Sequence, residues 1–309
     1  MTARDEGLRL EAGELEATFV PGDGMVGSSL RHRGEELLGQ RGGLAAYREQ
    51  LKTFGVPLLY PWANRLSRRR FGLAGREVTI DPERTPLRLD ESGLPIHGLL
   101  AAAQGWTVDR HVAAGAPAVV CATFDWSAHE ALMAAFPFPH ELRYEAALDG
   151  DTLTIVTTVE ASAGSPVPIA FGYHPYLRLP GVPRADWQVE LPVRTRLRLD
   201  DRTLPTGERE SVEPFAGPLG ARTFDDAFVA PARGAPFVLE GGGRRIELAF
   251  GGGYAYAQVY APADDDVIAF EPMTAPTDAL VAGPPELRVL APGESYAAAY
   301  SITVAVGPD

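Results

Sequence analysis

Turn-forming residues recur at short intervals along the whole chain, and they restrict its fold more than any other feature. The 33 glycines and 27 prolines are spread over all 309 residues instead of being gathered in one linker. Between them lie short segments in which apolar and polar residues alternate, the pattern of β-strands with one buried face. The clearest case joins residues 142–148 to residues 153–159 through Asp149-Gly150, which predicts a β-hairpin.

Alternating segments elsewhere predict many more strands and few helices. The strand-like segments are residues 7–20, 28–38, 71–80, 106–111, 118–125, 187–199, 237–250, 254–260, 267–270 and 295–306. Only residues 42–51 and 127–133 have the pattern of short helices. No amphipathic helix of about 10 to 15 residues alternates with the strands, which argues against a parallel βαβ fold, and no fixed-period repeat indicates a propeller. We therefore expect an all-β fold, a large antiparallel sandwich formed by one domain over residues 1–309.

The composition excludes several classes of partner. With 28 basic and 41 acidic residues the formal net charge is −13, so neither a nucleic acid nor a membrane surface is expected as a partner. Cys121 is the only cysteine, which excludes an intramolecular disulfide and a thiolate metal cluster. No apolar run reaches the roughly 20 residues of a membrane helix, and residues 1–6 do not read as a signal segment. We therefore expect a cytoplasmic protein.

His174 lies in the stretch Phe171-Gly-Tyr-His-Pro-Tyr-Leu-Arg-Leu179, between aromatic residues. Pro175 restricts the preceding residue to extended backbone geometry, which lets the imidazole point into a cleft. An unperturbed imidazole pKa of roughly 6.5 allows proton exchange near neutral pH. The alternative is a half-buried strand histidine with no chemical role.

Glu271 ends the apolar run 267–270 and is followed by Pro272 and Pro276. An unpaired charge at the end of an apolar strand is costly, and the prolines restrict the loop behind it. A carboxylate held in this way is a candidate general base. The alternative, a strand-end glutamate in water, is less favoured by these flanking residues.

Three further stretches place polar residues at turns. Asn64-Arg65 follows a segment rich in Pro and Trp and offers several hydrogen-bond donors. His97 precedes Gly98, which indicates a tight turn or a close backbone approach. The acidic pair Asp225-Asp226 lies between two phenylalanines. For each stretch the alternative is an ordinary turn or capping residue.

The six histidines never occur in an H-x-H or H-x-x-x-H pattern, so no metal site is expected. The glycine-rich segments 22–24 and 251–253 lack the lysine and the strand-loop-helix context of a phosphate-binding loop. No G-x-S-x-G elbow is present. The sequence thus gives no support to a nucleotide cofactor or a serine nucleophile.

In order, these stretches resemble the aldose 1-epimerase (mutarotase) family of the galactose-mutarotase-like superfamily. The matching motifs are Pro61-Trp-Ala-Asn-Arg65, Ile96-His-Gly98, Gly172-Tyr-His-Pro-Tyr176, Phe224-Asp-Asp-Ala-Phe228 and Phe270-Glu-Pro-Met-Thr274. Each is weak alone, but five in the family's order extend the resemblance over nearly the whole chain. The resemblance implies a β-supersandwich that interconverts the α and β anomers of a free monosaccharide by acid–base ring opening and reclosure, without a cofactor.

The resemblance also implies catalytic roles. Glu271 would take the proton from the C1 hydroxyl, and His174 would protonate the ring oxygen. His97 would assist at that oxygen. A carboxylate and an imidazole, with unperturbed pKa values of roughly 4.3 and 6.5, suit this exchange.

Substrate-binding roles follow in the same way. Arg65 and Asp225 would bind sugar hydroxyls, with Asp226 replacing Asp225 if the register differs by one residue, and Asn64 adds donors beside Arg65. Aromatic residues offer the sugar ring an apolar face, although core packing is their more common role. These are Tyr176, Tyr173, Trp62 and Phe270.

The sequence departs from galactose-type members after His174, where Pro-Tyr-Leu-Arg-Leu follows. Arg178 in that segment is either solvated or placed for an unusual hydroxyl or an acidic sugar. One alternative function is therefore a hexose-6-phosphate 1-epimerase, which needs converging arginines from a pool of Arg65, Arg68, Arg69 and Arg178. Another is a non-catalytic sugar-binding or regulatory protein on the same fold. We expect a monomer or a homodimer with a small sugar as its partner.

Overall fold

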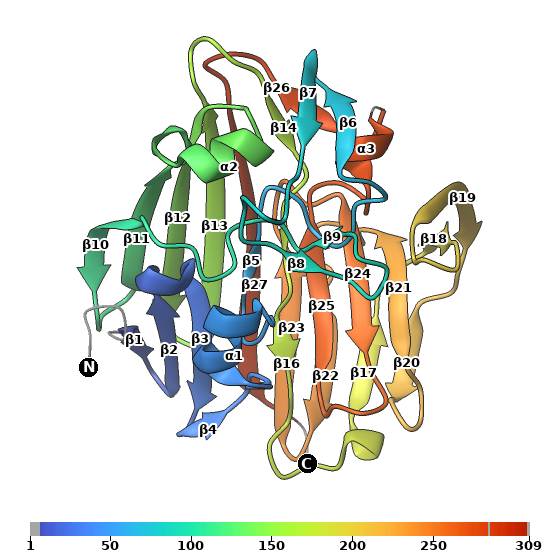
Figure 1. Cartoon of the computed structure of the whole chain (residues 1–309). Coiled ribbons are helices and arrows are strands. Elements are labelled where there is room, and N and C mark those ends of the chain that lie inside the picture. Colours follow the sequence, from blue (N-terminus) through green and yellow to red (C-terminus); the bar gives the residue numbers. More distant parts are fainter. Residues whose placement is uncertain (1–6, 284, 308–309) are drawn as a thin grey trace.

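The computed structural model describes residues 7–283 and 285–307 of the chain. Two large layers of antiparallel strands face each other across an apolar core (Figure 1). The predicted all-β architecture, a large antiparallel β-supersandwich with few short helices, is confirmed. Residues 1–6, for which no signal segment is expected, lie outside the described residues.

One layer is a nine-stranded sheet of order β10-β11-β12-β13-β27-β23-β22-β17-β20. Its strands are β10 (Thr107–Val112), β11 (Ala118–Asp125), β12 (His140–Asp149), β13 (Thr152–Ala161), β27 (Ser295–Val306), β23 (Arg244–Phe250), β22 (Phe237–Gly241), β17 (Gln188–Leu191) and β20 (Phe215–Pro218). β12 and β13 form the predicted hairpin. Because Asp149 pairs with Thr152, the turn residues are Gly150 and Asp151, and Gly150 has the positive φ of 59° that the turn requires.

The facing layer consists of a four-stranded and an eight-stranded sheet. The four-stranded sheet contains β1 (Leu8–Ala12), β2 (Leu15–Val20), β3 (Val26–His32) and β4 (Glu35–Glu36). The larger one has the order β19-β18-β21-β24-β25-β15-β5, and β16 also pairs with β25. Its strands are β19 (Pro205–Ser211), β18 (Thr195–Leu199), β21 (Phe224–Val229), β24 (Tyr256–Ala261), β25 (Ile268–Met273), β15 (Gly172–Tyr173), β16 (Tyr176–Leu177) and β5 (Leu58–Leu59).

Small elements cover the ends and openings of the sandwich. Three two-stranded sheets pair β6 (Arg70–Leu73) with β7 (Arg76–Thr79), β8 (Arg88–Leu89) with β9 (Pro95–Ile96), and β14 (Val167–Ile169) with β26 (Arg288–Leu290). The helices are α1 (Gly43–Gln50), α2 (Glu130–Ala135) and α3 (Ala279–Ala282), with 3-10 turns at Pro21–Asp23, Trp126–Ala128 and Arg184–Asp186. Within the described ranges, none of the helices has the length and hydropathy of a membrane-crossing segment.

The segment that carries β8 and β9 passes in front of β25 and β24 (Figure 1). Single bridges tie it down, from Tyr60 to Gly98 and from Arg65 to Ile96. Leu99 N donates to the Tyr60 carbonyl oxygen over 2.6 Å, which brings the chain after His97 into close contact with residue 60. This covering segment and the sheet beneath it enclose the site described below.

The structure differs from the strand predictions in several places. Residues 187–199 alternate without interruption, yet they form β17 and β18 in different sheets, because the chain leaves one layer at Pro192, which has no N–H to donate to a ladder. Phe224–Val229 is a strand and not a turn cap. β19 is not predicted, because its seven residues are mostly exposed and lack apolar alternation.

Replacing Gly98 by Ala should destabilise the protein by more than about 1 kcal/mol beyond the cost of the same change at Gly75. Both glycines have positive φ, 73° and 77°, so the backbone penalty is similar. A Cβ at Gly98 would lie 2.2 Å from the Tyr60 carbonyl oxygen, whereas one at Gly75 meets nothing within 4 Å. Denaturant unfolding of the two variants measures the difference, and equal losses would contradict this account of the close approach.

Candidate active site

All seven site residues expected from the sequence line one cavity of about 140 Å³. They are Asn64, Arg65, His97, His174, Tyr176, Asp225 and Glu271. Arg41, Arg88, Leu89, Asp90, Glu91, Ile96 and Tyr260 complete the lining. The chain therefore brings together polar residues that are up to about two hundred positions apart.

The ladder around β25 places Glu271 between His174 and Gln258. β15 pairs Gly172 with Met273, and β16 pairs Tyr176 with Ala269, so the intervening His174 lies opposite Glu271. On the other side of β25, Gln258 of β24 pairs directly with Glu271. Residues opposite one another in an antiparallel ladder share a face of the sheet. Accordingly, His174 Nε2 lies 3.1 Å from Glu271 Oε1.

A second row of the same ladder lies two residues along. Asp225 pairs with Tyr260, Tyr260 with Ala269, and Ala269 with Tyr176. The Tyr176 ring stacks on His174 with 4.0 Å between centroids, and the Tyr260 ring meets His174 edge-on at 5.4 Å. The two rings restrict the orientation of the His174 imidazole, and they give the cavity apolar walls.

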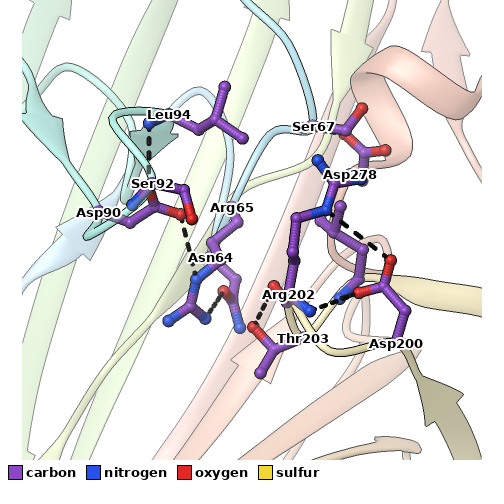
Figure 2. Close-up of polar contacts among 11 residues, drawn as sticks. Asn64, Arg65, Ser67, Asp90, Ser92, Leu94, Asp200, Arg202, Thr203 and Asp278 are labelled. Carbon is purple, nitrogen blue, oxygen red and sulfur yellow. Dashed lines mark hydrogen bonds and ion pairs between the residues drawn. The ribbon is translucent and has the colours of Figure 1, made fainter.

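The chain between β5 and β6, to which the covering segment is bridged at Arg65, supplies the Asn-Arg pair. Asn64 has a positive φ of 56°, and its Oδ1 accepts a hydrogen bond from Arg65 Nη1 over 3.2 Å. Arg65 Nε also lies 3.5 Å from Asp90 Oδ2, so the guanidinium is held between an amide and a carboxylate (Figure 2). Asp90 Oδ1 in turn accepts from the N–H groups of Ser92 and Leu94. Arg65 is therefore oriented by local contacts before any ligand binds.

Asp278 fastens this pair to the C-terminal part of the chain. Its N–H donates to the Arg65 carbonyl oxygen over 3.1 Å, and its Oδ1 accepts from Ser67 N over 2.7 Å. Figure 2 shows Asp278 beside Ser67, on the opposite side of Arg65 from Asp90. The backbone at Arg65 is thus anchored independently of its side chain.

Burial dominates the electrostatics of the Glu271–His174 pair. It raises the pKa of Glu271 well above the usual range, with the Asp225 carboxylate adding to the shift and Arg65 opposing it. Burial also holds the pKa of His174 well below its usual range, together with neighbouring His97 and Arg41. Among the residues that the structure describes, buried Glu271 Oε2 and His174 Nδ1 have no hydrogen-bond partner. Two buried polar atoms are therefore free for a ligand.

His97 approaches this pair from the covering segment. Its ring meets the His174 ring edge-on at 5.7 Å, and its backbone N–H donates to the Asn64 carbonyl oxygen. Burial, followed by the charges of Arg88, Arg65 and Arg41, lowers the pKa of His97 to about 3. His97 also has a positive φ of 65°, a conformation that is sparsely populated and concentrates at functional sites.

Asp225 lies where solvent reaches the cavity, and Gln258 Nε2 donates to its Oδ1 over 2.6 Å. Partial desolvation raises the pKa of Asp225, and the hydrogen bond from Gln258 opposes that shift. Asp226, the alternative candidate, does not line the cavity; it lies 3.4 Å from Arg196 Nη1. Neighbouring residues of a strand point to opposite faces, so Asp225 rather than Asp226 faces the site.

Several other candidates lie away from the cavity. Tyr173, Trp62 and Phe270 are buried in the core and do not line the cavity. Of the four arginines considered for a phosphate, only Arg65 lines it, whereas Arg68 and Arg69 are exposed. Arg178 is likewise absent from the lining, and its backbone N–H donates to the Leu37 carbonyl oxygen at the edge of β16.

The sequence alone does not indicate Arg41, Arg88, Gln258 or Tyr260 as site residues. Gln258 and Tyr260 are two positions apart in a strand that the sequence predicts. The sequence does not reveal which strands pair with it, and so it does not place these two residues at the site. Arg41 and Arg88 belong to no sequence motif that would indicate a site. In the described part of the chain, no group of three or more His, Cys, Asp or Glu side chains is arranged to hold a metal ion.

His97 should remain neutral at physiological pH. Because its pKa is lowered to about 3, its imidazole should keep a single N–H and show no titration between about pH 5 and 8. Histidine ¹⁵N NMR, assigned with a His97→Gln variant, measures this. A midpoint near the unperturbed value of roughly 6.5 would contradict the described environment.

Comparisons with known proteins place this geometry in context. The family model for aldose 1-epimerase matches residues 24–303. No curated protein sequence matches the chain significantly. Among solved structures, a galactose mutarotase-like protein from Clostridium acetobutylicum has a TM-score of 0.81 at 19% identity, over 96% of this chain and 94% of that one.

Two further structures show the same fold at low identity. A Synechocystis protein has a TM-score of 0.77 at 22% identity, covering 98% of this chain and 96% of its own. A galactose 1-epimerase from Lactobacillus acidophilus has a TM-score of 0.72 at 14% identity, with coverages of 97% and 94%. Since the family model matches most of its length, this chain belongs to the aldose 1-epimerase family.

Proposed function

We propose that the protein is a monosaccharide 1-epimerase in which Glu271 is the base and His174 is the acid. The observation that carries the proposal is the 3.1 Å contact between His174 Nε2 and Glu271 Oε1 inside the cavity. Family membership supports the reaction class. A sugar anomer changes when one group removes the C1 hydroxyl proton and another protonates the ring oxygen, and the two oxygens are bonded to the same carbon. Neighbouring acid and base groups suit that geometry.

In the forward step, Glu271 takes the proton from the C1 hydroxyl while His174 gives a proton to the ring oxygen. The C1–ring oxygen bond breaks, and the open chain carries an aldehyde at C1. Rotation about the C1–C2 bond presents the other face of the aldehyde. On reclosure the hydroxyl that contains the former ring oxygen attacks C1, and His174 takes back the proton of that hydroxyl. Glu271 returns a proton to the carbonyl oxygen.

The proton count of the pair fits this cycle. Burial raises the pKa of Glu271 and lowers that of His174, so between these two pKa values the pair holds one proton and has no net charge. A neutral glutamic acid beside neutral histidine and a carboxylate beside imidazolium are two forms of that state. In each step one proton leaves the pair and one proton joins it. The pair therefore holds the same number of protons after every turnover.

The remaining residues are assigned to binding. Neutral His97 has one ring N–H to donate at the sugar ring oxygen, and Arg65, fixed by Asn64 and Asp90, donates to hydroxyls. Asp225 accepts from hydroxyls at the opening of the cavity. The rings of Tyr176 and Tyr260 pack against the apolar face of the sugar.

Replacing Glu271 by Gln should lower the rate of anomer exchange by about 10²- to 10⁴-fold, because the amide cannot act as a base. Freshly dissolved α-glucose and α-galactose, followed by polarimetry, measure the rate, and circular dichroism checks the fold. The matched control is Glu91→Gln, which removes an exposed carboxylate from the same cavity and should keep most of the activity. Saturable sugar binding without any acceleration by the wild-type protein would instead favour a sugar-binding protein.

Replacing Asp225 by Asn should move the whole pH profile of kcat/KM to lower pH. The Asp225 charge raises the pKa of Glu271, and removing a nearby negative charge makes each protonation of the pair less favourable, so both limbs shift downward. Asp226→Asn, on the opposite face of β21, is the control and should shift the profile less. An upward shift with Asp225→Asn would contradict the proposed electrostatics.

A further inference from the structure

The cavity is lined by arginines in addition to Arg65, the one that the proposed function assigns to hydroxyl binding. Three arginines line it: Arg65, Arg41 and Arg88. Arg65 pairs with Asp90, and its charge acts on Glu271 and Asp225. Arg41 and Arg88 lie around Tyr176, on the side of the cavity where His174 is found.

Arg88 has few contacts. It comes from β8, and its Nη1 lies 3.5 Å from Thr53 Oγ1, which shares a 2.7 Å hydrogen bond with Tyr176 OH. Across residues 7–283 and 285–307, no carboxylate lies within ion-pair distance of its guanidinium. A guanidinium that lines a cavity without a counter-ion is a ready anion-binding group.

Arg41 is placed at the same wall by two contacts. Its guanidinium carbon lies 4.7 Å from the centre of the Tyr176 ring, and its Nε lies 3.2 Å from Asp265 Oδ2. Asp265 is outside the cavity lining, so it holds the side chain from behind. The arginine is thereby kept at the cavity wall.

Within the described ranges, none of the acidic residues that line the cavity forms an ion pair with Arg41 or Arg88. Asp90 is paired with Arg65, Asp225 with Gln258, and Glu271 with His174. Glu91 is exposed, so solvent screens its charge. The charges of Arg41 and Arg88 both reach His97 and His174 and oppose their protonation.

We propose that the sugar substrate carries an anionic substituent, a phosphate or a carboxylate, which Arg41 and Arg88 bind beside Tyr176. The inference rests on the proposed function. In a pyranose, C6 is attached to C5, which is bonded to the ring oxygen. With His174 at the ring oxygen, a substituent at C6 lies on the His174 side of the sugar, where Tyr176 and both arginines are found.

The test compares sugars that differ only at C6. NMR exchange spectroscopy gives kcat/KM for glucose, glucose 6-phosphate and glucuronate, and for the three corresponding galactose compounds. At least one anionic sugar should exceed its neutral counterpart. A phosphate-only preference identifies a sugar phosphate, and a carboxylate preference identifies a sugar acid. If no anionic compound exceeds its neutral counterpart, the inference is wrong.

Variants locate the effect in the cavity. Arg88→Gln and Arg41→Gln should each lower the ratio of anionic to neutral kcat/KM by about 10- to 100-fold, the scale of a lost charge-assisted hydrogen bond. Arg68→Gln makes the same charge change at an exposed arginine outside the lining and should leave the ratio unchanged. If the ratio of anionic to neutral kcat/KM were the same in all three variants, the assignment of Arg41 and Arg88 to anion binding would be wrong.

Calorimetric binding to Glu271→Gln separates this inference from the proposed function. Tighter binding of anionic than neutral sugars, weakened by adding Arg88→Gln, supports the anion site even if the wild-type protein accelerates no exchange. Turnover of neutral sugars with no preference for anionic ones leaves the proposed function in place and contradicts the anion site.

Discussion

The antiparallel ladder on both sides of β25 is the constraint on which the rest of the site depends. Glu271 has a fixed neighbour on each side, His174 in the short break between β15 and β16 and Gln258 on β24. A slip of one residue would turn Glu271 to the opposite face, among the core residues that surround Phe270. The continuous apolar core therefore fixes the site as well as the fold.

This arrangement keeps a carboxyl group in an environment that disfavours its charge. Glu271 is 2% exposed, and one of its oxygens has no hydrogen-bond partner in the described part of the chain. Such burial costs stability unless the surrounding structure enforces it. Strand pairing provides that enforcement, since Glu271 cannot leave the cavity without breaking the ladder. Under the proposed function, the cost is balanced by a base whose pKa lies above that of an exposed glutamate.

Much of this could be predicted from the sequence, and the remainder depends on partners that are distant in the chain. Alternation and the turn at Gly150 predict the hairpin of β12 and β13, because those signals are local. The split of residues 187–199 between two sheets is set by which strands flank β17 and β18, which alternation cannot reveal. Likewise, Asp225 differs from Asp226 only by the face of β21, and Arg88 reaches the cavity only because β8 and β9 cross over the sheet.

The cavity is assembled from two separate parts of the chain. Its floor comes from residues 174–271, and its cover comes from residues 41–97. The proposed acid and base belong to the floor, whereas Arg41, Arg65, Arg88 and His97 belong to the cover. Arg41, Arg65 and His97 lie outside the named strands, and Arg88 lies in the two-residue strand β8. Such connecting segments tolerate insertion and replacement far better than the strands of the large sheets do. Selectivity and reaction chemistry are therefore free to evolve at different rates in this protein, with new sugars admitted through changes in the cover while the ladder stays the same.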